Sequence, residues 1–311
     1  MIKKTLYFGN PAYLSLTDKQ LVIKIPAIEN SDMGETFKRE NRRTIPIEDI
    51  GVVVIDNKQI SITSGAIEAL LENNCAVISC DNRSMPVGLM LPLCGNTLQS
   101  ERFRHQIDAS LPLKKQLWAQ TVQQKIANQT AVLSLMTDAE TGCMHKWADS
   151  VRSGDPDNLE ARAAAYYWKN VFPSLPDFVR DRDGEAPNAM LNYGYAILRA
   201  VIARSLVGSG LLPTLGIHHH NRYNAYCLAD DIMEPYRPYV DYHVAGLMQK
   251  YDCDELTREL KAQLLVIPTL DVVVGGRRSP LMVAAGQTTA SLYKCFSGES
   301  RKILYPELTP F

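Results

Sequence analysis

The chain has 311 residues and a formal net charge of -1, with 46% apolar and 22% charged residues. This length is sufficient for two domains with sizeable cores, and the composition is that of an ordinary globular protein. The near-neutral charge argues against a wholly basic nucleic-acid binder. It still allows one basic face, because the local field rather than the net charge steers DNA.

The cysteines and the N-terminus indicate a reducing compartment. The seven cysteines are scattered, and no C-x-x-C pair occurs. This pattern favours reduced thiols over a disulfide framework or a zinc finger. The first residues lack the apolar run of a signal peptide. The longest apolar stretch, near 187–208, contains Asn192, Arg199 and Arg204, so we expect a buried helix rather than a membrane span. We therefore expect a cytoplasmic protein.

Residues 1–93 have the pattern of a β domain. Short apolar or alternating runs predict strands at 5–8, 13–16, 20–25, 44–47, 51–55, 59–63, 75–80 and 87–93. One short helix is expected to begin near Ser64, which can cap it, and to end at Asn73. The spacing of these strands favours a small β-sandwich. Residues 30–43 carry four basic side chains and are either a solvated hairpin loop or a DNA contact.

A helical pattern follows the polar linker at 94–97. Apolar residues with helical spacing predict helices at 99–106, 113–136, 158–172, 189–207 and 254–265. The charged, proline-containing segment 174–188 is expected to be an exposed loop. We therefore predict a two-domain α+β protein. An N-terminal β-sandwich-like domain over 1–93 is followed by a larger all-α helical domain over 94–311.

Residues 215–241 contain the strongest candidate for a metal site. A histidine triplet, His218–His220, precedes an acidic pair, Asp230–Asp231, and then Glu234. Imidazole and carboxylate groups together suit hard to borderline cations. Asp231 and Glu234 are three residues apart, so they share one face of a helix. The alternative is a loop of solvated histidines, with Glu234 ending a helix before Pro235.

A second candidate carboxylate is Glu160. Asp157 or Asn158 can cap a helix, which would place Glu160 in its first turn. An acidic side chain in that position commonly stabilises the helix by interacting with its dipole, so a purely structural role is one interpretation. The four alanines between 161 and 165 would allow another helix or a ligand to approach closely.

Several segments together resemble the CRISPR-associated integrase family, the metal-dependent nuclease and integrase of spacer acquisition, in its type II form. The resemblance covers nearly the whole chain. In the histidine region it rests on residues 216–221, 224–226 and 228–238. Residues 45–56, 69–78, 154–168 and 188–198 resemble further segments of that family in the same order.

The resemblance implies a catalytic metal site for Mg²⁺ or Mn²⁺. Its ligands would be Glu160, His219 and Glu234. His219 is chosen because it lies fifteen positions before Glu234, while His218 and His220 remain alternatives one residue away. A set of two carboxylates and one histidine suits these cations for phosphoryl chemistry, and zinc would also accept it.

Other residues are expected near the site or on DNA. By resemblance, Asp231 would lie beside the metal or the DNA, and Asn192 and Tyr195 would approach the active site. Arg237 could hold a DNA phosphate or a carboxylate within the core. The turn carrying Arg277 and Arg278 is either a phosphate contact or a solvated basic loop.

The resemblance also implies the reaction and the partners. The helical domain would be a DNA endonuclease and integrase in which the 3′-hydroxyl of a captured fragment attacks a phosphodiester at the edge of the CRISPR repeat. The protein would bind double-stranded DNA, form a homodimer through its β domain, and assemble with a dimer of the small second adaptation protein. The alternatives are a non-catalytic structural DNA-binding subunit and a small-molecule metallohydrolase. Metal-dependent nicking of DNA would exclude the first, and a requirement for duplex DNA would exclude the second.

Overall fold

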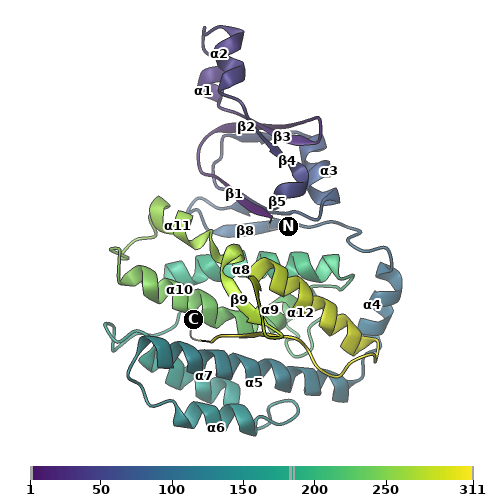
Figure 1. Ribbon diagram of the computed structural model, residues 1–311, viewed down its shortest axis with the longest axis vertical. Helices are drawn as coiled ribbons and strands as arrows, with labels where there is room; N and C mark the ends of the chain where they lie inside the picture. Colours follow the sequence, from purple (N-terminus) through teal and green to yellow (C-terminus); the bar gives the residue numbers. More distant parts are fainter. Residues whose placement is uncertain (1–2, 182–183, 185, 310–311) are drawn as a thin grey trace. The chain divides into compact units, whose positions relative to one another are not determined.

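The computed structural model describes residues 3–181, 184 and 186–309. The chain folds into two compact units, Met1–Gly95 and Asn96–Phe311 (Figure 1). Among the described residues, no helix is long and apolar enough to cross a membrane.

The first unit contains two four-stranded sheets. One has the order β1 (Lys4–Phe8), β5 (Ile50–Ile55), β7 (Ala76–Cys80), β8 (Pro86–Met90), and the other β4 (Arg43–Pro46), β3 (Gln20–Lys24), β2 (Ala12–Thr17), β6 (Ile60–Ile62). Strands β1, β5 and β7 run parallel, and β2 and β3 form an antiparallel hairpin. Helix α3 (Ser64–Glu72) is capped by the Thr63 side chain rather than by Ser64.

Apolar side chains from the strands and from α3 form the core of this unit. Leu14, Leu21, Ile50 and Leu70, which come from both sheets and from α3, are buried in one apolar cluster. Strand β5 reads as a continuous apolar run because a central parallel strand is covered on both faces. The expectation of a β-rich N-terminal region is confirmed.

The expected hairpin loop at residues 30–43 is partly wrong. The antiparallel strands β3 and β4 are joined by two short helices, α1 (Pro26–Glu29) and α2 (Glu35–Glu40). Arg42 pairs with Glu29 through two hydrogen bonds of 2.8 and 2.9 Å, so this basic side chain is neutralised within the segment.

The second unit is mainly helical. Its helices are α4 (Gln99–Ile107), α5 (Leu111–Met136), α6 (Gly142–Ser150), α7 (Leu159–Asn170), α8 (Asn188–Gly208), α9 (Cys227–Met233), α10 (Arg237–Met248), α11 (Arg258–Leu264) and α12 (Leu281–Phe296). Two 3₁₀ turns, η2 (Glu234–Tyr236) and η3 (Ile267–Thr269), join some of them; a third, η1 (Ile47–Asp49), precedes β5 in the first unit.

The long helices α5 and α8 organise this unit. Helix α5 contacts α6, α7, α10 and η2, whereas α8 contacts α9, α10, α11 and α12 (Figure 1). Because α5 meets both α7 and η2, it brings together the two segments that carry Glu160 and Glu234.

The expectation that the second unit is entirely helical is wrong. Strands β9 (Asp271–Val274), β10 (Arg277–Pro280) and β11 (Pro306–Glu307) form a small sheet with the order β10-β9-β11. Gly275 and Gly276 both have positive φ, 57° and 73°, and they form the two-residue turn between β9 and β10. Glycine adopts this conformation without steric cost, so the pair favours a tight hairpin.

Candidate functional site

Glu160 and Glu234 meet at a single lysine. The Lys125 ammonium on α5 lies 2.7 Å from Glu160 Oε1 and 2.6 Å from Glu234 Oε2. The exposed fractions of the three side chains are 12%, 22% and 6% in that order. The fold therefore brings together two of the three predicted ligands, which are far apart in sequence, in a partly buried cluster.

Glu160 is held at the start of α7 by an unexpected residue. Asp155 accepts hydrogen bonds from the backbone N–H groups of Leu159 and Glu160, both at 2.9 Å. Asn158 occupies the N-cap position and Glu160 the first turn, as expected, but Asn158 makes no side-chain cap and Asp157 pairs with Arg152 instead. The Asp155 carboxylate satisfies the first helical donors and so fixes the turn that presents Glu160.

Glu234 is fixed by a second cation and by α5. Arg237 Nη2 lies 3.1 Å from Glu234 Oε1, and Asn128 of α5 donates to the adjacent Pro235 carbonyl at 2.7 Å. Burial by itself raises the pKa of Glu234, but the charges of Arg237 and Lys125 overcome that effect and hold the pKa below its usual value. Glu234 is therefore a buried carboxylate that stays ionised.

Asp231 organises the histidine turn. It is fully buried, and its carboxylate accepts the backbone N–H groups of Ile217 and His218 at 2.7 and 3.0 Å and that of His219 at 3.3 Å. A Cβ on Gly216 would lie 2.4 Å from the His219 carbonyl oxygen and 2.8 Å from Asp231 Oδ2, so only glycine fits this turn. The acidic side chain predicted to lie near the metal thus holds the backbone in place.

The three histidines have different environments. His219 Nδ1 is 2.5 Å from Asp231 Oδ1, and this hydrogen bond raises the pKa of His219 despite partial burial. The charges of Glu234 and Glu160 act on this pKa in the same direction. His218 instead stacks on Trp118 with 4.1 Å between ring centroids, and all three histidines are exposed. This geometry favours His219 over its neighbours as a ligand.

Another buried carboxylate, Asp241, lies in the same unit. It accepts hydrogen bonds from the Tyr195 and Tyr167 hydroxyls at 2.5 and 3.0 Å. Burial raises the pKa of Asp241 to about 7. Arg237 lies over the Tyr195 ring, 4.9 Å from its centroid, so Tyr195 is linked to Glu234 through one guanidinium group.

Asn192 lies in the outer part of this network. It accepts a hydrogen bond of 2.6 Å from Arg180, whose guanidinium group also lies 5.3 Å from the centre of the Tyr195 ring. Asn192 is therefore linked to Tyr195 through Arg180, and Tyr195 is linked to Glu234 through Arg237.

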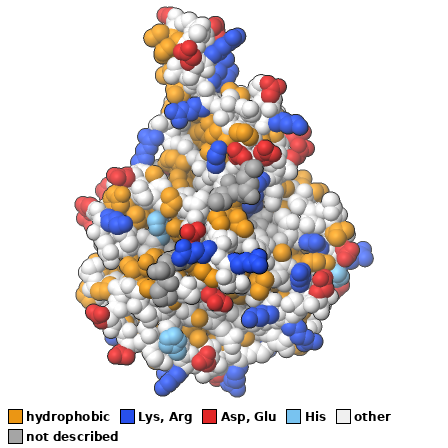
Figure 2. All heavy atoms as spheres, viewed as in Figure 1, with side chains coloured by type: hydrophobic (Ala, Val, Ile, Leu, Met, Phe, Trp, Pro, Cys, Tyr) orange, Lys and Arg blue, Asp and Glu red, His pale blue; other side chains and the backbone are white. Residues whose placement is uncertain are grey.

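Arg277 and Arg278 lie on a different element. Both are exposed on β10, where they pair in register with Val274 and Val273 of β9. This strand carries none of the three predicted ligands. Figure 2 shows basic side chains dispersed among acidic and uncharged ones over the second unit.

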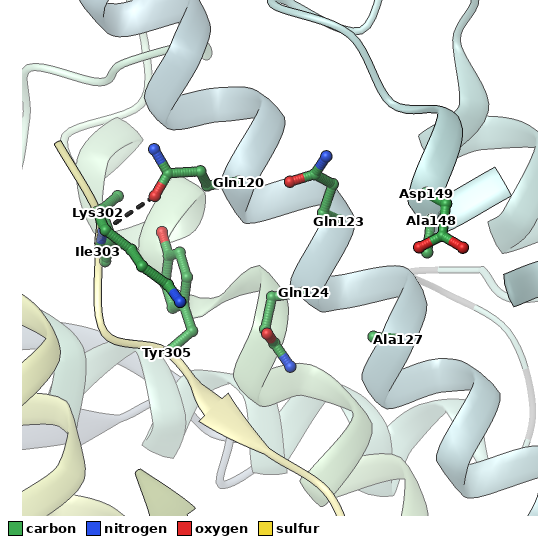
Figure 3. A pocket seen from close by; sticks show the side chains of 9 residues that line it. All are labelled: Gln120, Gln123, Gln124, Ala127, Ala148, Asp149, Lys302, Ile303 and Tyr305. Carbon is green, nitrogen blue, oxygen red and sulfur yellow. Dashed lines mark hydrogen bonds between the residues drawn. The ribbon is translucent and has the colours of Figure 1, made fainter. Parts of the chain in front are cut away.

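A polar pocket of about 400 Å³ lies beside α5 (Figure 3). Three glutamines of α5, Gln120, Gln123 and Gln124, line it together with Lys302 and Tyr305. Gln120 accepts a hydrogen bond from the Ile303 backbone at 3.0 Å, so part of this amide surface serves the fold. None of the three predicted ligands lines the pocket.

Sequence comparisons match known proteins over the whole chain. The family model of the CRISPR associated protein Cas1 matches residues 6–265. A CRISPR-associated endonuclease Cas1 from Neisseria meningitidis serogroup C is 35% identical over 313 residues, which cover 100% of this chain and 98% of that protein. A second relative, from Pyrobaculum aerophilum, is 29% identical and covers 73% of this chain and 81% of its own length.

Solved structures share the fold. A casposase bound to integration product has a TM-score of 0.77 at 20% identity, covering 97% of this chain and 92% of its own. A Cas1 protein from Thermotoga maritima has a TM-score of 0.71 at 13% identity, covering 95% and 97%. The resemblance drawn from the sequence motifs is confirmed by the family match and by the relative from Neisseria: the chain belongs to the Cas1 family of CRISPR-associated endonucleases.

Proposed function

We propose that this protein is the DNA integrase of type II CRISPR adaptation, and that Glu160, His219 and Glu234 form its catalytic centre. Family membership supports the biological role. The observation that carries the assignment of the site is the convergence of Glu160 and Glu234 on one cation, the Lys125 ammonium, at 2.7 and 2.6 Å.

The donor set fits Mg²⁺ or Mn²⁺. Among the residues that the structure describes, no three His, Cys, Asp or Glu side chains are already arranged as a metal cluster. The two carboxylates nevertheless hold a cation between them, and oxygen donors with one imidazole suit either metal. When bound by Glu160, His219 and Glu234, the metal would act as a Lewis acid that neutralises charge on the scissile phosphate.

The protein's own groups prepare this site. Asp231 accepts a hydrogen bond from the Nδ1–H group of His219. In a neutral ring, this arrangement leaves the lone pair on Nε2 free for a ligand. Arg237 holds one oxygen of Glu234, and the low exposure of that side chain strengthens each charge interaction around it. No protein nucleophile is required, because the 3′-hydroxyl of the DNA fragment attacks the phosphodiester in this proposal.

DNA and a second adaptation protein are the proposed partners. Structures with the same fold include a Cas6-RT-Cas1–Cas2 complex, with a TM-score of 0.72, and a TtCas1–DNA complex, with a TM-score of 0.59. We propose that this chain likewise binds double-stranded DNA and the small second protein, and that its β-rich first unit supplies a homodimer contact.

A strand-transfer assay tests the proposal, with a labelled fragment bearing a 3′-hydroxyl and a target bearing the repeat. Glu160→Ala, His219→Ala and Glu234→Ala should each abolish product formation with Mg²⁺ or Mn²⁺. His220→Ala is the matched control, because it is the same substitution at the neighbouring histidine, to which the proposal gives no role. Full activity of either glutamate variant would refute the site. If His218→Ala loses activity while His219→Ala remains fully active, the ligand is His218 rather than His219.

A further inference from the structure

Lys125 occupies the position between the two proposed carboxylate ligands. Its ammonium group bonds one oxygen of Glu160 and one of Glu234 at the same time. The lysine side chain is only 12% exposed, so few waters can replace those contacts. Among the pairs observed in the described residues, Glu234 has a second cation in Arg237, whereas Glu160 is paired with Lys125.

The backbone that carries Lys125 is firmly placed. One turn further along α5, Asn128 donates to the carbonyl groups of Pro235 and Pro306 at 2.7 and 2.9 Å. These bonds tie α5 to the turn that begins with Glu234. Any movement of the ammonium group must therefore come from rotation of the lysine side chain, which has several rotatable bonds.

We propose that Lys125 is an internal cation that holds Glu160 and Glu234 together before metal binding and competes with the metal for their oxygens. The inference rests on the proposed metal site. A carboxylate oxygen bonded to an ammonium group at 2.6–2.7 Å offers the same lone pairs that a metal needs. The positive charges also repel, so the metal gains both carboxylates only when the ammonium group withdraws.

Removing this charge should affect metal binding and stability in opposite directions. Lys125→Met keeps the length and apolar stem of the side chain but removes the competitor. We expect Mn²⁺ to bind the variant at least tenfold more tightly than it binds the natural protein. In EDTA the same variant should melt at a lower temperature, because two adjacent carboxylates have lost their shared counter-ion. The rise in melting temperature on adding Mn²⁺ should therefore be larger in the variant.

The experiment is calorimetric titration of Mn²⁺ into the full-length protein without DNA, with melting curves in EDTA and in Mn²⁺. Lys115→Met is the matched control, because Lys115 is an exposed lysine on the same helix. Its Mn²⁺ affinity should equal that of the natural protein. Lys125→Gln gives the same comparison with a neutral polar side chain, should the methionine variant unfold in EDTA.

Glu160→Gln separates the two hypotheses. If it leaves Mn²⁺ binding intact, the proposed metal site is wrong. If it abolishes binding while Lys125→Met and Lys125→Gln bind Mn²⁺ no more tightly than the natural protein, only the role of Lys125 is refuted. Tighter binding in both Lys125 variants, with no change in Lys115→Met, supports the competition.

Discussion

Two buried carboxylates in the helical unit, Glu234 and Asp241, have opposite electrostatic environments. Glu234 is bonded to the cations of Lys125 and Arg237, and its pKa is held below the usual value. Asp241 is bonded to two neutral phenols, and its pKa is raised to about 7. Burial opposes the charge of both groups, so the difference comes from their partners.

The difference in pKa between Glu234 and Asp241 indicates different roles for these two carboxylates. A carboxylate that remains ionised in a buried position can exchange one cation for another, which is what a metal ligand must do. A carboxyl group with a pKa of about 7 is only partly ionised at neutral pH, so it attracts cations more weakly. Arg237 connects the two, since it bonds Glu234 and lies over Tyr195. We therefore infer that the Asp241 network supports the proposed metal site from outside.

The largest effect should come from neutralising Glu234. Glu234→Gln removes the anion shared by the largely buried Lys125 and the partly exposed Arg237, and breaking a buried pair costs about 3–5 kcal/mol. Glu160→Gln should cost less, because Glu160 is 22% exposed and pairs with Lys125 alone among the described residues. Urea unfolding in EDTA measures both values. A larger loss of stability in Glu160→Gln than in Glu234→Gln would contradict the assigned pairing.

The ionisation of Asp241 should be visible in the pH dependence of stability. Its pKa is about 7 in the folded chain, above the value of about 3.9 expected after unfolding, so the folded state binds this proton more tightly. The free energy of unfolding should therefore fall as the pH rises from about 4 to about 7, by on the order of 4 kcal/mol at most, and this contribution should be level above pH 7.

Asp241→Asn provides the control for that pH effect, because an amide does not titrate. Its free energy of unfolding should change less than that of the natural protein between pH 4 and 7. Parallel pH profiles for the two proteins would show that Asp241 keeps an ordinary pKa, and the contrast with Glu234 would then disappear.

A smaller effect is expected at Asp231, which supports the histidine turn. Asp231→Ala leaves buried backbone N–H groups of residues 217 and 218 without an acceptor, which costs about 1–3 kcal/mol. It also frees the His219 ring, and loss of such an orienting partner typically reduces metal affinity by about 10–100-fold. Urea unfolding and Mn²⁺ titration measure the two consequences. Unchanged Mn²⁺ affinity would show that the ring needs no support.

The sequence predicted the two longest helices well, but it missed α12, which has 16 residues, and α10, which has 12, as well as several short elements. The expected helices at 113–136 and 189–207 match α5 and α8 within two residues, because long periodic segments bury one continuous face. The expected helix at 254–265 begins only at Arg258, where Thr257 caps it. The small sheet was missed because strands of two to four residues have no usable periodicity.

The site was predicted only in part, for a related reason. His219, Glu160 and Glu234 belong to recognisable motifs, but Lys125 is one polar residue among many on α5 and has no local signal. Its importance depends on two chain segments 35 and 109 residues further along, which only the fold brings to it. Asp241 was missed because nothing in its sequence neighbourhood indicates that two tyrosine hydroxyls from other helices will bond to it.

The smallest expected effect concerns Arg277 and Arg278, which lie on β10 and apart from both carboxylate sites. Between residues 272 and 302 the chain has five basic side chains and one acidic one, so we propose that this region contacts DNA. Each phosphate contact releases counterions, and its loss lowers the salt dependence of binding. Arg277→Ala combined with Arg278→Ala should weaken DNA binding and reduce the slope of log affinity against log salt by about 2 at most. The double variant should keep its Mn²⁺ affinity, because β10 carries none of the proposed ligands.

Binding isotherms at several salt concentrations measure the slope. Lys115→Ala is the control, because it removes one positive charge from another element. An unchanged slope would mean that both guanidinium groups serve the hairpin or the solvent, and that DNA reaches the carboxylates by another face.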